Sequence, residues 1–291
     1  FSDSLTSIWT GDFGDYPNLF SGALGAWWAL VGGQPEDLLM RMFPLIGMAL
    51  AVAGLGLMLR PNPKRVLPAI YGLLLLPMAN GICRHYMPEG LVMGFLVLSM
   101  GLGLWLIRNP STWGAIIWGT VLGFGLLTKH NFVILALVPT LWILYRLKLK
   151  SIPAILMLLI ISLPWYATVG LTKQTYLVTT LQSPASWWSQ LLAHPVGFMW
   201  DGLGPLLSIG FLFCLRPPKS DIRTLSFLWL IGGLIALCVL PKQYPRLLLP
   251  LLPAAIVLIS IRAEDLSLGR VLGFALPLFA WLHLSSIVNI P

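Results

Sequence analysis

Basic clusters recur along this very apolar sequence about every two membrane widths, and this rhythm constrains the fold more than any other feature. The mean hydropathy is +0.86, 57% of the residues are hydrophobic and only 10% are charged. A water-soluble fold made from such a chain would expose far more apolar surface than a soluble monomer tolerates. We therefore expect an all-α polytopic membrane protein, because each spanning helix satisfies its own backbone hydrogen bonds.

Apolar stretches of about 17 to 25 residues match a hydrocarbon core about 30 Å thick. The sequence contains about ten such stretches, at 38–60, 66–83, 88–107, 112–128, 131–147, 152–170, 203–215, 223–240, 245–262 and 271–288. We expect one transmembrane domain over residues 1–291, with a further span upstream of Phe1. Its extracytoplasmic segments, 1–37 and 171–202, are expected to carry short interfacial helices.

The positions of Lys and Arg predict the orientation, because short loops rich in these residues stay in the cytoplasm. One alternating set of loops holds Arg60, Lys64, Arg65, Arg108, Arg146, Lys148, Lys150, Arg216, Lys219, Arg223, Arg262 and Arg270. The other set holds Arg41, Arg84, Lys129, Lys173, Lys242 and Arg246. We predict that the larger set is cytoplasmic and that the smaller set lies on the far, extracytoplasmic side.

Several classes of protein are disfavoured. The net charge of +8 lies mostly in short loops beside spans and forms no aromatic-interleaved patch, so nucleic acid is not an expected partner. Cys83, Cys214 and Cys238 lack paired spacing and are interpreted as packing residues. His194 and His283 lack metal-ligand spacing and receive no role. No cofactor motif occurs, and a divalent metal is left open but not indicated.

The unusual ionisable residues and their neighbours gather on the predicted far side, where charge near the membrane is costly and usually functional. They are Asp3, Asp12, Asp15, Arg84, His85, Glu89, Lys129, His130, Lys242, Tyr244 and Arg246. Carboxylates beside Lys and Arg at one membrane face suit a substrate that is anionic at one end and loses a proton at the other. A phosphate-linked lipid and a hydroxyl acceptor together have these properties.

Each of these residues also has a purely structural interpretation. The three aspartates fit solvated loop acids. Glu89 follows a proline in the first turn of a helix, where a carboxylate interacts favourably with the helix dipole. Lys129 and Arg246 fit side chains that extend to lipid headgroups, and His130 fits a polar edge residue. The sequence leaves both interpretations open.

Four short motifs give the chain a resemblance to a known family. They are Tyr16-Pro17-Asn18-Leu19 followed by an amphipathic stretch and residues 34–41; Arg84 with Glu89; Gly-Phe-Gly-Leu-Leu-Thr-Lys at 123–129; and Pro-Arg-Leu-Leu-Leu-Pro-Leu-Leu-Pro at 245–253. In this order they resemble the motifs of GT-C class integral membrane glycosyltransferases, in the family 39-like branch of the protein mannosyltransferases and the aminoarabinose transferase. The chain departs from the pattern at Asn18, where the family often has proline, and at Glu89, where it usually has Asp.

The resemblance implies inverting transfer of a hexosyl or pentosyl group from a polyprenyl-phosphate donor to a lipid, glycan or protein acceptor. The reaction would take place at the extracytoplasmic face of a multi-pass protein, expected in a bacterial plasma membrane among membrane lipids. The nearest match to the catalytic aspartate is Asp3; Asp15, Glu89 or a residue upstream of Phe1 are the alternatives. Implied substrate-binding residues are Tyr16, Arg84, His85, Lys129, His130, Lys242, Tyr244 and Arg246.

Two other functions remain open at this level. A lipid-carrier flippase or secondary transporter would also use basic residues at membrane depth, but typically near the midplane and often within inverted repeats. A non-catalytic membrane scaffold would leave the far-side acidic segment without a role. A far-side cavity that holds a carboxylate and two or more basic groups would favour the transferase.

Overall fold

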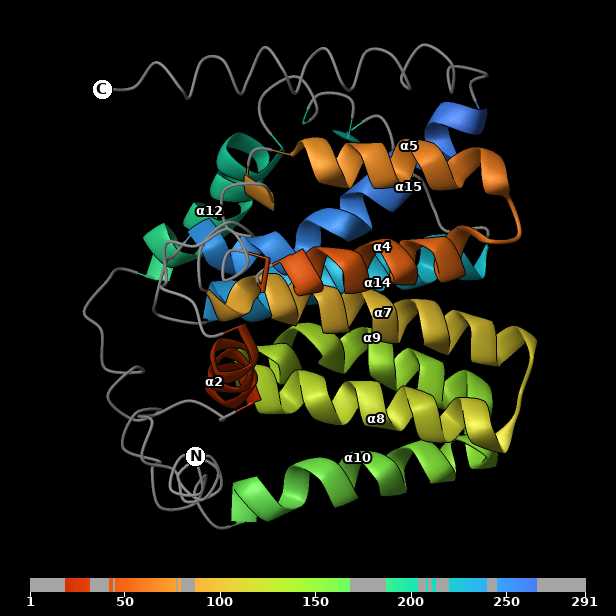
Figure 1. The fold of residues 1–291 in the computed structure, drawn as a ribbon. Coiled ribbons are helices and arrows are strands. Elements are labelled where there is room, and N and C mark those ends of the chain that lie inside the picture. Colours follow the sequence, from red (N-terminus) through yellow and green to blue (C-terminus); the bar gives the residue numbers. More distant parts are fainter. Residues whose placement is uncertain are drawn as a thin grey trace.

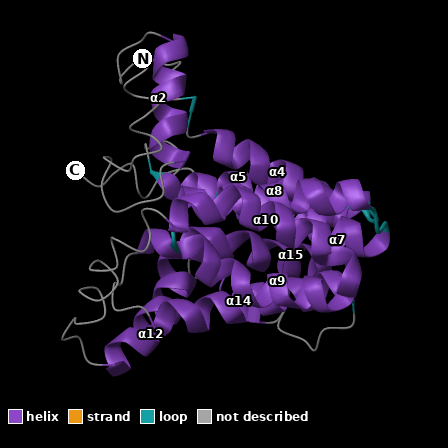
Figure 2. Cartoon of the chain, turned by 90° about the horizontal axis from the view of Figure 1, so that it is seen from below, coloured by secondary structure: helices purple, strands orange, loops and turns teal. Residues whose placement is uncertain are grey.

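The computed structural model describes only part of the chain. The described residues are 19–31, 42–43, 45–76, 78–79, 87–167, 187–203, 208, 211–212, 220–239 and 245–265. Within them every regular element is a helix, which confirms the expected all-α fold (Figure 1, Figure 2).

The helices match most of the expected spans. The α-helices are α2 Leu19–Val31, α4 Leu45–Leu59, α5 Pro63–Leu75, α7 Pro88–Arg108, α8 Thr112–Thr128, α9 Asn131–Leu147, α10 Ile152–Trp165, α12 Trp187–Gly197, α14 Asp221–Val239 and α15 Leu252–Asp265. Shorter segments are the 3-10 helices η1 Lys148–Ser151 and η4 Pro245–Leu251 and the π-helix η3 Phe198–Leu203. The expected spans at 203–215 and 271–288 lie largely or wholly outside the described residues.

Three helical stretches of the described chain are long and apolar enough to cross a membrane. They are Pro88–Arg108, Asn131–Trp165 and Asp221–Cys238, while α4 and α8 are shorter apolar helices. The stretch from Asn131 to Trp165 reverses direction at Lys148, whose φ of 51° is rare outside glycine. This reversal returns α10 along α8 (Figure 1), so the stretch supplies two separate helices, α9 and α10, as the sequence predicts. The total of about ten spans stays a prediction.

Helices α4 and α7 touch through their backbones. A Cβ atom added at Gly47 would lie 2.2 Å from the carbonyl oxygen of Gly90, and one at Gly101 would lie 2.4 Å from that of Gly54. Small residues let membrane helices approach closely and gain packing contacts. The first turn of α7 is therefore held directly against α4.

The bundle has two opposite ends (Figure 1), and the described ion pairs occur at both of them. We call the end with the α4–α5, α7–α8 and α9–α10 turns the basic end. There Arg146 pairs with Asp221 at 2.5 Å, and Arg65 pairs with Glu264, which joins α9 to α14 and α5 to α15. These arginines belong to the set that is predicted to be cytoplasmic.

We call the opposite end, where α7 begins and α8 meets α9, the Glu89 end. Helix α2 lies across this end instead of running along the bundle, and α12 is found there too (Figure 1, Figure 2). Both helices come from the segments in which we expect short interfacial helices.

Candidate active site at the Glu89 end

The site is built around a buried carboxylate in the first turn of α7. Pro88 occupies the start of that helix, where its missing N–H has no helical acceptor, and Glu89 follows it. The Glu89 side chain is only 3% exposed. A carboxylate at this depth requires compensating charge.

Lys129 supplies the first compensating charge. It caps the C-terminus of α8 and belongs to the two-residue link between α8 and α9. Its Nζ donates a hydrogen bond to Oε1 of Glu89 at 2.7 Å, and its own side chain is 8% exposed. The tight link fixes the backbone of Lys129, whose carbonyl oxygen accepts a hydrogen bond from the Phe132 amide at 3.0 Å.

Arg246 supplies the second positive charge from η4, which lies beside α7. Its Nε is 3.2 Å from the same Oε1 of Glu89, but its side chain is 39% exposed. Three segments that are far apart in sequence thus converge on one oxygen atom. We call Glu89, Lys129 and Arg246 the charged triad.

The charged triad consists of one carboxylate and two cationic side chains, so the formal charges of these three residues add up to a net positive charge. The second carboxylate oxygen, Oε2 of Glu89, is buried and accepts no hydrogen bond within the described part of the chain. A buried acceptor that lacks a donor costs free energy, about 1–3 kcal/mol. The arrangement can therefore receive an anion at its cations and a hydroxyl or amino donor at Oε2.

An aromatic cluster lies beside the charged triad. The His130 ring is 5.8 Å from the Trp165 ring and 6.3 Å from the Tyr166 ring, centroid to centroid. Tyr166 also donates a hydrogen bond from its hydroxyl to the Leu126 carbonyl at 3.2 Å, which links the end of α10 to α8. The sequence analysis missed Trp165 and Tyr166, although an aromatic pair at the predicted far-side end of a span was a usable signal.

His194 is another buried polar residue that the sequence analysis left without a role. It lies in α12, which packs against η4 and α14, and it is 2% exposed. Its Nε2 has no hydrogen-bond partner among the described residues, and burial lowers the pKa of the imidazole. The histidine thus adds a desolvated imidazole to α12, which packs against η4 and α14.

The structure brings together three of the predicted site residues, Glu89, Lys129 and Arg246, with His130 next to them. The remaining predicted site residues lie outside the described part of the chain and are Asp3, Asp15, Tyr16, Arg84, His85, Lys242 and Tyr244. Their roles stay predictions. Among the described residues, no group of three or more His, Cys, Asp or Glu could hold a metal ion.

Comparison with known proteins gives a structural match only. No family model matches the sequence, and no curated protein matches it. Two crystal structures of ArnT from Cupriavidus metallidurans do match, one in the apo state and one bound to undecaprenyl phosphate. Each gives a TM-score of 0.65 over 90% of this chain, with identities of 15% and 17% respectively.

The matches cover 53% and 54% of the ArnT chains, so this chain spans about half the length of that protein. The structural similarity covers 90% of this chain, although the sequence matches no family model. The chain therefore shares its fold with ArnT, an aminoarabinose transferase of the GT-C class, which confirms at the level of the fold the resemblance that the motifs indicate.

Proposed function

We propose that this protein transfers a sugar from a polyprenyl-phosphate donor to an acceptor at the extracytoplasmic face of the membrane. The observation that carries the proposal is the charged triad: two cations on one buried carboxylate at one end of an apolar helical bundle. Its net positive charge suits a lipid phosphate. The fold shared with ArnT, one structure of which holds undecaprenyl phosphate, supports the same substrate class.

The two cations differ in how they could meet a phosphate. Lys129 is buried against Glu89 and stays there as a fixed positive charge. The side chain of Arg246 is 39% exposed. Its guanidinium presents several N–H donors, which can bind phosphate oxygens in pairs. In this proposal Arg246 makes the direct contact with the phosphate, and Lys129 stabilises the charge that develops there.

The transfer step is a direct displacement. The acceptor oxygen or nitrogen attacks C1 of the sugar, the bond from C1 to the phosphate oxygen breaks, and the electron pair leaves with the phosphate. Arg246 and Lys129 stabilise that leaving phosphate electrostatically. A carboxylate takes the acceptor proton, a contribution of about 10²- to 10⁴-fold. Attack from the face opposite the phosphate inverts C1.

Glu89 fits a substrate-holding role better than the role of base. Protonation of Glu89 would remove the counter-charge of the buried Lys129 ammonium. Its Oε2 is instead open to accept a hydrogen bond from a sugar hydroxyl or amino group. We assign the base to Asp3 or Asp15, the aspartates that the resemblance implies.

The position of the charged triad also favours a transferase over a secondary transporter, the alternative function that the sequence left open. A secondary transporter binds its substrate near the bilayer midplane, typically at broken helices. Here the described polar cluster lies where α7 begins and α8 ends, at one end of the bundle (Figure 1). That placement favours chemistry at one membrane face.

Binding of a polyprenyl phosphate to the purified protein tests the proposal. Arg246→Ala should weaken binding about 10- to 100-fold, because a hydrogen bond to a charged group contributes about 1.5–3 kcal/mol. Arg146→Ala is the matched control: Arg146 also pairs with a carboxylate and is also 39% exposed, but it lies at the basic end. Equal affinities for the Arg246 and Arg146 variants would refute the phosphate site.

A further inference from the structure

The turn between α9 and α10, at the basic end, has a fixed backbone and exposed side chains. Lys148 adopts a φ of 51°, and such a conformation persists only where the surrounding structure holds it. Its amide donates a hydrogen bond to the Leu144 carbonyl, and its carbonyl oxygen accepts one from the hydroxyl of buried Ser151 at 2.6 Å. Lys148, Leu149 and Lys150 are all exposed. The turn therefore presents a Lys-Leu-Lys sequence at the surface of the protein.

Lys148 and Lys150 differ from the paired arginines of the basic end. Arg65 and Arg146 each form an ion pair with a carboxylate. Neither lysine has an ion-pair partner or a side-chain hydrogen bond among the residues that the structure describes. Two cations that lie two residues apart without a counter-charge attract an anion from outside the described chain.

Strongly exposed apolar side chains occur in and near this turn. Leu149 is 81% exposed, Tyr145 in the last turn of α9 is 75% exposed, and Trp113 in the first turn of α8 is 76% exposed. With Leu30 at the Glu89 end, they are the four most exposed large hydrophobic side chains of the described chain. Helix α8 also contacts η1. Aromatic residues of this kind are enriched at the level of the lipid headgroups, where one side of a ring is apolar and the other is wet.

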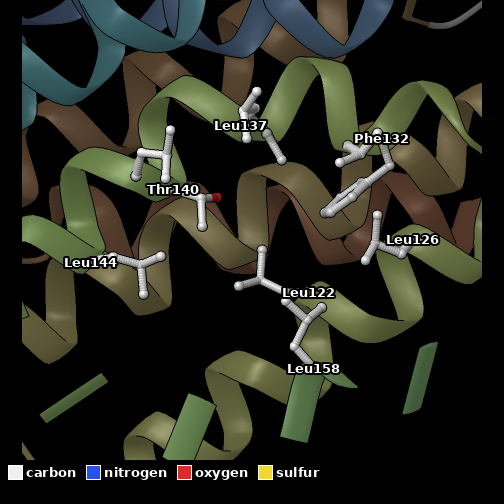
Figure 3. A pocket seen from close by; sticks show the side chains of 10 residues that line it. Leu122, Leu126, Phe132, Leu137, Thr140, Leu144 and Leu158 are labelled. Atoms are coloured by element: carbon white, nitrogen blue, oxygen red, sulfur yellow. The ribbon is translucent and has the colours of Figure 1, made fainter. Parts of the chain in front are cut away.

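Away from this turn, α9 and α10 offer a lipid almost no charge. Helix α10 contains no charged residue, and α9 contains only Arg146, which pairs with Asp221. The pocket that these helices form with α8 is lined by apolar side chains and by Thr140, the single polar residue in its lining (Figure 3). Along the two described helices, the turn is therefore the place where a lipid meets unpaired cations.

We propose that this turn binds the phosphate headgroup of an anionic phospholipid in the membrane leaflet at the basic end. The lysine ammonium groups contact the phosphate, and the exposed apolar side chains enter the boundary between headgroups and acyl chains. The inference does not depend on the proposed function, because the turn and the charged triad lie at opposite ends of the bundle. We call the following five residues the turn site: Trp113, Tyr145, Lys148, Leu149 and Lys150.

The turn site should prefer phospholipids with a net negative charge. Phosphatidylcholine carries the same phosphate as phosphatidylglycerol, but its choline cation opposes the approach of lysine. A lysine near an anionic membrane surface contributes about fivefold to binding. The two lysines together should therefore favour phosphatidylglycerol by about 10- to 30-fold.

Native mass spectrometry of the whole protein in detergent tests this preference. The protein is titrated with phosphatidylglycerol or phosphatidylcholine of identical acyl chains. The double variant Lys148→Gln with Lys150→Gln should lose the preference for phosphatidylglycerol. The matched control is Arg60→Gln with Lys64→Gln, which removes two exposed cations around the α4–α5 turn of the same end and should keep the preference. An unchanged preference in the first double variant, or an equal loss in both, would overturn the turn site.

A second pair of variants tests the apolar part of the site. Leu149→Ser should weaken phosphatidylglycerol binding about fivefold, because serine loses apolar contact with the lipid. Leu30→Ser is the matched control, since Leu30 is 83% exposed but lies in α2 at the Glu89 end. Equal affinities for these two variants would refute insertion of Leu149. Soluble glycerol phosphate should not displace the lipid; full displacement would show that the occupant is a free phosphate compound instead.

Arg246→Ala separates this inference from the proposed function. It should weaken binding of a polyprenyl phosphate and leave the preference for phosphatidylglycerol unchanged. Loss of that preference in Arg246→Ala would place the anionic phospholipid at the charged triad, which overturns the turn site and leaves the transferase proposal intact. Normal polyprenyl-phosphate binding by Arg246→Ala, together with loss of the preference in the Lys148 and Lys150 double variant, would refute the phosphate site of the transferase and support the turn site.

Discussion

The two ends of the helical bundle use the same kinds of side chain in opposite ways. At the basic end, Arg146 and Asp221 pair at 2.5 Å with both side chains 39% exposed. At the Glu89 end, Lys129 and Glu89 pair at 2.7 Å with side chains 8% and 3% exposed. Water screens the first pair, whose net contribution is about 0–1 kcal/mol. The second pair is desolvated, so removal of either partner is costly.

The contrast shows that the number of ion pairs does not reveal their purpose. Pairs at the basic end join neighbouring helices and remain accessible to solvent. The charged triad concentrates two cations on one oxygen and leaves Oε2 of Glu89 buried without a donor from the described chain. A protein that needed only stability would gain little from this arrangement, because apolar residues fill such space at least as well.

The largest expected effect is at Glu89. Glu89→Leu should lower the free energy of unfolding by about 3–5 kcal/mol, because it removes the buried carboxylate that pairs with Lys129. Asp221→Leu at the basic end should change stability by less than about 1 kcal/mol. Thermal or denaturant unfolding in detergent measures both. Similar losses for the two variants would remove the distinction between the ends.

The next effect concerns the contact that holds the first turn of α7. Gly47→Ala should destabilise the protein by about 1–3 kcal/mol, because its methyl group would collide with the Gly90 carbonyl. Gly56→Ala on the same helix meets no atom within 4 Å and should be neutral or slightly stabilising. Gly47→Ala should also weaken polyprenyl-phosphate binding, since it displaces the turn that carries Glu89. A destabilised variant with unchanged binding would contradict this positional link.

The smallest expected effect is a pH dependence at His194. Burial lowers its folded-state pKa, so the unfolded chain takes up the proton more readily as pH falls through about 6.5. Stability should therefore decrease below that pH, by at most about 1.4 kcal/mol per pH unit from this group. His194→Phe should flatten that slope. An unchanged slope between wild type and His194→Phe would show that other groups cause it.

The sequence predicted some helix boundaries correctly and missed others. The expected span 112–128 agrees with α8, whose N-terminus is capped by Ser111 through a hydrogen bond from the Gly114 amide. The expected span 66–83 is wrong at its start, because Pro63 begins α5 three residues earlier. Its first turn carries Lys64 and Arg65, which an apolar window excludes.

The members of the charged triad could be predicted, but not their geometry. Their placement beside short turns on the predicted far side marked Glu89, Lys129 and Arg246 as candidates. That both cations share one carboxylate oxygen depends on how closely η4 approaches α7. No local pattern encodes that approach. Trp165 and Tyr166 were missed for a related reason, since their contact with His130 exists only because α10 reverses beside α8.

The glycine contact between α4 and α7 also bears on how this protein could acquire new specificity. Where backbone meets backbone, there is no side chain to exchange, so nearly every substitution at Gly47 or Gly54 introduces a collision. Few single substitutions are therefore tolerated where α4 contacts α7. The outward face of α9 differs, because Leu137 and Leu141 are half exposed there. Substitutions on that face of α9 should therefore be tolerated far more readily than substitutions at the glycines between α4 and α7.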